Sequence, residues 1–239
     1  MTVSLDHADG RSTLRFERVL AHGRGRVWRA VTEPDELVQW FPSAVIYEPR
    51  AGAPMQFDFG GEHGIDAWPG VVVAWEPERA FAFRWGEEDV LRFELSDAEG
   101  GGTRLVFTHA FAHQPGKEAR DGAGWTACFA ALDGLLAGEG GPAPGDFEGR
   151  QGELAAQFGS GLVLEADGRR RPISLVGPYA EVHGRAAVAV ALDGERGVLV
   201  VDAAGAALED GVPVAVRAGT VADPGATLLT GVLRDPLAA

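Results

Sequence analysis

A long stretch of alternating apolar residues, followed by a segment of helical spacing, limits the folds open to this chain more than any other feature. Between Ala44 and Ala112 apolar side chains recur at every second position, which indicates strands with one buried face. Short turns rich in Gly, Pro or acidic residues separate these runs, so we predict a meander of antiparallel strands. The rows expected to share a face are Met55, Phe57 and Phe59; Val71, Val73 and Trp75; Leu91, Phe93 and Leu95; and Leu105, Phe107 and His109.

Helices are predicted on both sides of this meander. A strand over Ser12–Leu20 precedes a helix over Arg26–Thr32, and a second helix begins at Pro34, a residue suited to the first helical turn. After the meander, Glu118–Ala137 returns to a spacing of three and four, which indicates one long helix. A twisted sheet closed by such a helix can enclose a hollow, so a ligand-binding cup is the first hypothesis. The apolar face of the long helix holds Trp125, Cys128, Phe129, Leu132, Leu135 and Leu136.

The rest of the chain predicts a second domain. Residues 138–145 are rich in Gly and Pro and indicate a linker, and Phe147–Phe158 has the spacing of a short amphipathic helix. After Gly159 only short Val, Leu and Ala runs occur between turns, which predicts a small all-β unit of about six strands. We expect an α+β protein with a first domain over residues 1–158 and a small β-rich domain over 159–239. The expected strands of the second are Leu162–Glu165, Pro172–Val176, Ala187–Leu192, Gly197–Val201, Val212–Val216 and Ala226–Val232.

Charge and cysteine content exclude several function classes. The 35 acidic and 21 basic residues give a net charge of -14, whereas nucleic-acid binding rests on clustered Lys and Arg. An acidic surface also disfavours anionic membranes, and no segment reaches the length of a membrane-spanning helix. Residues 1–7 lack the basic and apolar regions of a secretion signal, so we expect a cytoplasmic protein. The single cysteine, Cys128, leaves no intramolecular disulfide and no cysteine-based zinc site.

Motifs that carry a family resemblance are spread over residues 12–138. They are residues 27–34 (Val-Trp-Arg-Ala-Val-Thr-Glu-Pro), Leu37 with Trp40 and Phe41, the turn 51–53 before Phe57, residues 70–72 followed by 77–79, the strand 103–107, and Gly124 with Trp125. In this order they resemble the START-like (SRPBCC, helix-grip) superfamily, and most closely its branch named after the activator of heat-shock-protein ATPase, which is abundant in bacteria. The resemblance implies an antiparallel sheet wrapped round a long C-terminal helix. Because the superfamily includes lipid carriers, hormone receptors and polyketide cyclases, it implies little about function.

The interior of such a cup supplies the candidate ligand-binding residues. Aromatic rows can either fill an interior as core or line it as a binding site. His109 is the one titratable group in the apolar row of its strand, where it can orient a ligand carbonyl, act as a general base, or serve as a hydrogen-bonded structural histidine. The side chains expected to line the cup are Trp40, Phe57, Phe83, Trp85, Phe93, His109, Trp125 and Phe129.

Other candidate sites carry less weight. His113 follows His109 by four residues, which span about 13 Å in a strand, so we reject a shared metal ion. The Gly-rich stretch 60–68 is expected to form a flap, whose acidic and imidazole groups either hold a cation or are simply solvated. Cys128 is expected to be a buried, unreactive thiol. No Gly-x-Ser-x-Gly, Walker-type or complete dinucleotide motif occurs. The flap groups are Glu62, His63 and Asp66.

These observations favour a binding protein over an enzyme. We expect the cup to bind an apolar or amphiphilic small molecule, with no catalytic residues, cofactor, metal, nucleic acid or membrane, and with the C-terminal β domain as the place for any protein partner. The first alternative is an enzyme like a polyketide cyclase or dehydratase, using His109 with Asp58 or Arg92. Strand alternation counts against it, because Asp58 and Arg92 face away from the aromatic rows. The second alternative is a co-chaperone-like interaction module, which would expose an apolar patch.

Overall fold

The computed structural model describes residues 1–59, 68–113, 116–139, 145–166, 168–182, 185–192, 195–201, 212–219 and 224–234. The chain divides into two compact units, the first made of Met1–His113 and Trp125–Gly145, the second of Gln114–Gly124 and Asp146–Ala239. Within the described residues, the first unit carries an eight-stranded antiparallel sheet and the second a closed barrel of six strands.

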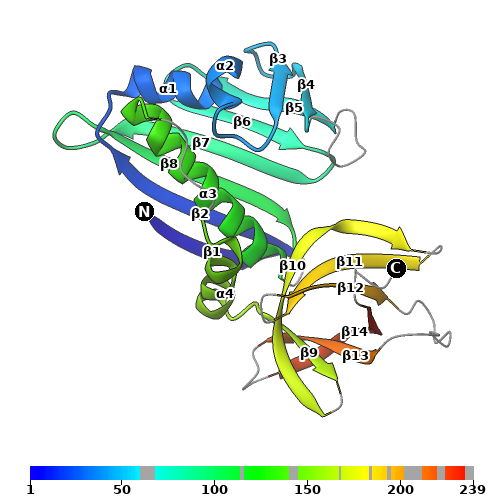
Figure 1. Ribbon diagram of the computed structural model, residues 1–239. Helices are drawn as coiled ribbons and strands as arrows, with labels where there is room; N and C mark the ends of the chain where they lie inside the picture. Colours follow the sequence, from blue (N-terminus) through cyan, green and yellow to red (C-terminus); the bar gives the residue numbers. More distant parts are fainter. Residues whose placement is uncertain are drawn as a thin grey trace. The chain divides into compact units, whose positions relative to one another are not determined.

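The sheet of the first unit is a meander with two further strands at one edge (Figure 1). Its spatial order is β1-β2-β8-β7-β6-β5-β4-β3. The strands from β3 to β8 pair in sequence order, which confirms the predicted meander, and β2 joins it by pairing with β8. The strand bounds are β1 (Thr2–Ala8), β2 (Arg11–Leu20), β3 (Ala44–Tyr47), β4 (Pro54–Asp58), β5 (Trp68–Glu76), β6 (Ala80–Trp85), β7 (Asp89–Asp97) and β8 (Thr103–Ala112).

Three helices complete this part of the chain. Helices α1 (Arg24–Thr32) and α2 (Pro34–Leu37) connect β2 to β3, and α3 (Lys117–Ala137) follows β8. Pro34 occupies the first turn of α2, as predicted, because its missing N–H would have no helical partner there. Among the described residues, no helix is both long and apolar enough to cross a bilayer.

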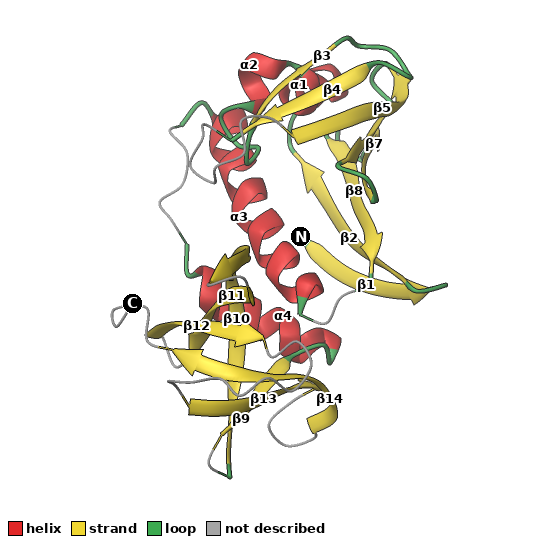
Figure 2. Ribbon diagram, turned by 90° about the vertical axis from the view of Figure 1, so that its right-hand side faces the viewer, coloured by secondary structure: helices red, strands yellow, loops and turns green. Residues whose placement is uncertain are grey.

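From Trp125 onward, α3 lies against one face of the sheet (Figure 2). The Phe129 ring centre is 5.3 Å from that of Phe16 on β2, and the Trp125 ring is 4.7 Å from Phe107 on β8. Arg18 of β2 donates to the carbonyl oxygen of Phe129 at 3.1 Å. A sheet that wraps a long helix in this way is the helix-grip fold, as the sequence predicted.

Strand β1 is an edge strand that the sequence analysis did not predict. It pairs with β2 over its whole length, from Thr2 opposite Glu17 to Ala8 opposite Arg11. Only Val3 of β1 is buried, so the strand lacks the apolar alternation on which the prediction of strands relied.

The expected row of Val71, Val73 and Trp75 is wrong at Val71 and Val73, since Val71 pairs with the exposed Arg84 and Trp75 with the buried Phe81. The pairing of β5 with β6 shifts register between Val72 and Ala74, so Val72 is 1 % exposed and Val73 is 51 % exposed. A bulge that inserts one residue reverses which positions face the core. Alternation read from the sequence cannot locate such an insertion.

The second unit contains α4 (Phe147–Phe158) and the barrel strands. Helix α4 has the predicted bounds: Asp146 caps its start by accepting a hydrogen bond from the Gly149 N–H at 2.8 Å, and Gly159 ends it in the left-handed conformation. The six predicted strands are all present. They are β9 (Leu162–Ala166), β10 (Arg169–Val182), β11 (Arg185–Leu192), β12 (Glu195–Val201), β13 (Val212–Gly219) and β14 (Pro224–Arg234).

The barrel closes because β9 pairs on both sides. Its neighbours are β10 and β13, in the circular order β10-β11-β12-β14-β13-β9. Alternate residues of β9 point inward, so Leu162, Leu164 and the partly buried Ala166 belong to the barrel core. The other buried core side chains are Ile173, Val190, Leu199, Val214 and Val216.

Candidate functional site

The eight side chains predicted to line the cup come together inside the first unit. Seven of them are at most 4 % exposed, and Trp85 is partly exposed. The ring centres of Trp85 and Trp125 are 6.1 Å apart, and Phe129 lies 6.3 Å from Trp125. These contacts show that the rings meet one another across the interior. The eight are Trp40, Phe57, Phe83, Trp85, Phe93, His109, Trp125 and Phe129.

Phe41 is a further member of this cluster that the site prediction left out. It is 5 % exposed, and its neighbour Trp40 is also buried, with its indole N–H donating to the carbonyl oxygen of Ala30 at 2.8 Å. The sequence offered one indication of this role, which is that Trp40 and Phe41 are adjacent aromatic residues just after α2. Neither helical nor strand periodicity, however, places two consecutive side chains on the same buried face. The Phe41 ring centre lies within 6.3 Å of those of Phe57, Phe83, Trp85 and Trp125.

Two hydrogen bonds fix the protonation of His109. The indole Nε1 of Trp125 lies 3.1 Å from Nδ1 of His109, and Nε2 of His109 lies 3.0 Å from Oδ2 of Asp89. An indole N–H can only donate and a carboxylate can only accept. Nδ1 therefore carries no proton, and the imidazole is the neutral Nε2–H tautomer that donates to Asp89. This confirms His109 as a hydrogen-bonded histidine in the apolar row of β8.

The bonds of His109 lead from the aromatic interior toward solvent. The His109 side chain is 3 % exposed, whereas that of Asp89, the first residue of β7, is 26 % exposed. The Asp89 carboxylate is therefore partly accessible to solvent, and carboxylate oxygens accept hydrogen bonds from hydroxyl and N–H groups. Asp89 was not singled out from the sequence, because an acidic residue at the start of a strand normally indicates only a solvated turn.

Three aromatic side chains gather at the same end of the sheet as Asp89. Trp85 pairs directly with Asp89 in the register of β6 and β7, and the Phe59 ring stacks on Trp85 at 6.0 Å. The indole of Trp68, which is 42 % exposed, lies over Gly86, where an added Cβ would come within 2.6 Å of the Trp68 Nε1. We call Phe59, Trp68 and Trp85 the aromatic rim.

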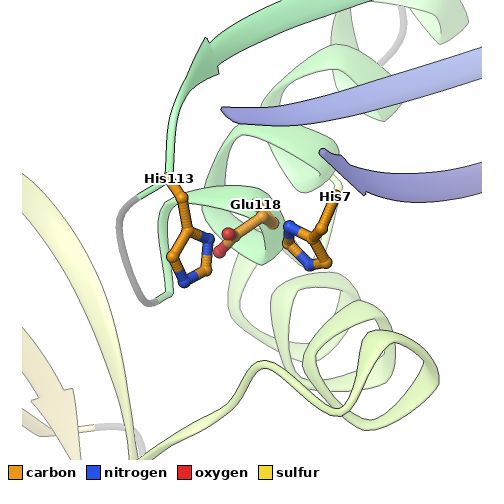
Figure 3. Close-up of side chains that lie close together, drawn as sticks. All are labelled: His7, His113 and Glu118. Carbon is orange, nitrogen blue, oxygen red and sulfur yellow. The ribbon is translucent and has the colours of Figure 1, made fainter. Parts of the chain in front are cut away.

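His113 lies in a different environment from His109. Its ring is 5.0 Å from that of His7 on β1, in an edge-on arrangement (Figure 3). Ser12 Oγ lies 3.0 Å from Nδ1 of both imidazoles. A hydroxyl has one proton to donate, so Ser12 can donate to one Nδ1 while the other imidazole donates to Ser12.

The acid and base proposed for an enzyme do not gather around His109. Asp58 is exposed, and Arg92 forms an ion pair with Glu94 at 2.9 Å on the face of β7 opposite Phe93. Burial raises the pKa of the Cys128 thiol to about 12, which favours the unreactive thiol expected from the sequence. The proposed flap groups Glu62, His63 and Asp66 lie outside the described residues.

Comparisons with known proteins agree with this fold. Residues 21–137 match the model of the family described as Activator of Hsp90 ATPase homolog 1-like protein. A conserved protein of unknown function from Enterococcus faecalis is 19% identical, with a TM-score of 0.56 over 65% of this chain and 89% of its own. The crystal structure of CalU16 from Micromonospora echinospora is 19% identical, with a TM-score of 0.50 over 66% of this chain and 93% of its own. A search of curated proteins found no match.

Proposed function

Since residues 21–137 match the Activator of Hsp90 ATPase homolog 1-like family, we propose that the first unit binds one apolar or amphiphilic small molecule at its aromatic rim. Its apolar body packs against Phe59, Trp68 and Trp85, and its polar head hydrogen-bonds to Asp89. The observation that carries this proposal is the bonded chain from Trp125 through His109 to Asp89, which sets one polar group at the margin of an aromatic interior.

The chemistry of the rim limits the class of ligand. When an apolar ligand covers the aromatic rings, both surfaces are removed from water. This burial of apolar surface is the main driving force for ligand binding at a site of this kind. Asp89 accepts hydrogen bonds, so it favours a head group that donates, such as a hydroxyl or an amine. The aromatic rings of the interior already contact one another. We therefore place the ligand at the aromatic rim and not in the deep interior.

The contacts of His109 favour binding over catalysis. A general base needs a ring nitrogen with a lone pair that can reach the substrate proton. In His109 the lone pair of Nδ1 accepts from Trp125, and the proton of Nε2 points to Asp89. We therefore assign His109 a positioning role: it holds the Asp89 carboxylate in one orientation.

Native mass spectrometry of freshly purified protein, followed by organic extraction, tests this proposal. We expect a defined mass above that of the chain and one extracted compound that carries both an apolar body and a donor group. A clean apo mass together with an empty extract contradicts the proposal and favours a fully packed core.

A matched pair of variants makes the test specific for the rim. Asp89 and Asp97 stand at opposite ends of β7, and Asp97 pairs with Arg24 at 3.2 Å. We expect Asp89→Asn to lower the retained fraction of ligand about tenfold, since a hydrogen bond to a charged group is the stronger kind, and Asp97→Asn to retain it as the wild type does. If both variants retained the same fraction of ligand, Asp89 would not be part of the binding site.

A further inference from the structure

The second unit contains a pocket of its own, with a volume of about 190 Å³. It is lined by residues from the start of α3 and the turn before it, from α4 and the turn after it, and from the barrel strands β9, β10 and β13. A cavity on the order of 150 Å³ is enough to hold one benzene ring. The pocket is therefore large enough for a single ring with one small substituent.

Close backbone contacts form one side of this pocket. The Gly219 N–H donates to the carbonyl oxygen of Gly161 at 2.8 Å, and a Cβ on Gly161 would come within 2.7 Å of the Gly219 oxygen. A Cβ on Gly116 would come within 2.7 Å of the Leu162 side chain. Glycine at these positions lets the segments approach closely and leaves the neighbouring space open.

Two polar atoms in the lining have no hydrogen-bond partner among the described residues. They are Oε1 of Gln151, whose side chain comes from α4, and Oγ of Ser160, just after the end of that helix. Gln151 is only 4 % exposed. Buried acceptors are nearly always satisfied in folded proteins, and leaving one unpaired costs free energy. A buried amide in a pocket wall is therefore poised to receive a hydrogen bond from a bound molecule.

None of the described lining residues is charged; apart from Gln151 and Ser160 they are Gly, Ala, Val, Leu, Ile or Pro. A charged ligand would lose its hydration here without gaining a counter-ion, whereas a neutral one would not. We propose that this pocket binds a small neutral molecule made of one apolar ring and a hydroxyl group. The hydroxyl donates to Gln151 Oε1, and the ring packs against Leu162 and Ile173.

Fluorine NMR with a matched pair of probes tests this site on the full chain. The probes are 4-fluorobenzyl alcohol and 4-fluorotoluene, which share the ring and differ in the hydroxyl. We expect the alcohol to bind about tenfold more tightly than the toluene, since one buried hydrogen bond accounts for such a ratio. In ¹⁵N-labelled protein, the alcohol should shift the backbone amides of Gly152, Ser160 and Gly161.

Three variants of α4 test whether the two probes occupy this pocket. Gln151→Leu should abolish the preference for the alcohol, while Gln157→Leu, the same change at an exposed position outside the lining, should keep it. Gly152→Leu should weaken the binding of both probes, because Gly152 lines the pocket and a larger side chain there adds bulk at its wall, while a Cβ meets nothing within 4 Å. Leucine also favours the helix over glycine, so this variant should remain folded.

The outcomes that overturn the proposal are distinct from those that bear on the aromatic rim. Absence of binding by both probes, equal affinity for the two, or amide shifts confined to the first unit would each refute it. Unchanged binding by Gly152→Leu would do the same. A rim that holds no ligand leaves this result unaffected, because every residue in the test belongs to the second unit.

Discussion

The indole Nε1 of Trp125 lies 3.1 Å from Nδ1 of His109, so a single donor decides which nitrogen of a buried imidazole carries the proton. Helix α3 supplies the donor and β8 the acceptor. The bond therefore ties the gripping helix to the sheet as well as orienting the group that holds Asp89.

Replacing Trp125 by Phe keeps an aromatic ring but removes this donor. We expect Trp125→Phe to lower the free energy of unfolding by about 1–3 kcal/mol from the unpaired nitrogen, in addition to the cost of a smaller ring. Urea unfolding measures the loss, and ¹⁵N NMR of the imidazole measures the tautomer, which should be Nε2–H in the wild type and mixed in the variant.

Trp28→Phe serves as the control for ring size, because Trp28 is also buried in the first unit, 5.1 Å from Trp75. The two variants should differ by the hydrogen-bond contribution. An unchanged tautomer in Trp125→Phe would show that this bond does not set the protonation of His109.

The bulge in β5 gives a prediction on two adjacent residues of the same type. Val72 is buried and Val73 is half exposed, so Val72→Ala should cost about 2 kcal/mol of unfolding free energy through lost burial. Val73→Ala should change it by less than about 0.5 kcal/mol, as surface substitutions usually do. Denaturant titration measures the unfolding free energy of both variants. A larger loss in Val73→Ala than in Val72→Ala would contradict the bulge and bury Val73, as the sequence pattern predicted.

The raised pKa of the Cys128 thiol predicts slow chemistry. With a pKa of about 12, the thiolate fraction at pH 8 is about a thousandfold lower than for an ordinary thiol, and the thiolate is the nucleophile. We expect a disulfide reagent to label native protein at least that much more slowly than protein unfolded in guanidinium chloride. Equal labelling rates would mean that Cys128 is accessible and ionised.

Tyr47 predicts a loss of stability at alkaline pH. Burial, reinforced by the charge of Glu33, raises the pKa of the Tyr47 phenol above its ordinary value. Since the folded state holds the neutral phenol, its contribution is complete below the unfolded pKa of about 10 and is lost as the pH rises further. Tyr47→Phe should flatten this loss in urea unfolding curves between about pH 9 and 11.

At pH 7 the same variant should be less stable by about 1 kcal/mol, because the Tyr47 hydroxyl donates to the carbonyl oxygen of Thr32. Cys128→Ala should accompany the measurement. The thiol pKa is raised as well, so its contribution begins to be lost earlier, near pH 8.5. A Tyr47→Phe curve parallel to that of the wild type would contradict the assignment.

The sequence predicted the parts of the fold in which pattern and burial coincide. Leu14 and Phe16 on β2, Phe57 on β4 and the Trp125 face of α3 are buried as expected, because amphipathic periodicity is itself a record of which face is covered. The prediction failed for β1, which is a strand through its backbone pairing with β2 and has no apolar alternation. It also failed in β5, where one inserted residue at Val73 changes the register.

In the candidate site, too, some residues follow from the sequence pattern and others do not. Aromatic residues of the cup follow from alternation, but Asp89 is recognisable only through the partner it finds twenty residues away on another strand. The orphaned Gln151 oxygen in the second unit is equally invisible to sequence, since a glutamine on an amphipathic helix normally predicts a solvated side chain.

The pairing of β2 with β8 has a consequence for synthesis on the ribosome. Arg11 pairs with Ala112 and Leu20 with Thr103, so the hairpin of β1 and β2 is translated long before its second neighbour exists. Until then the faces of Leu14 and Phe16, fully buried at the end, are open to other nascent chains. Such distant pairing slows folding and exposes strand edges. The β2–β8 pairing is thus one of the long-range steps of folding, because about eighty residues must be made between its two strands.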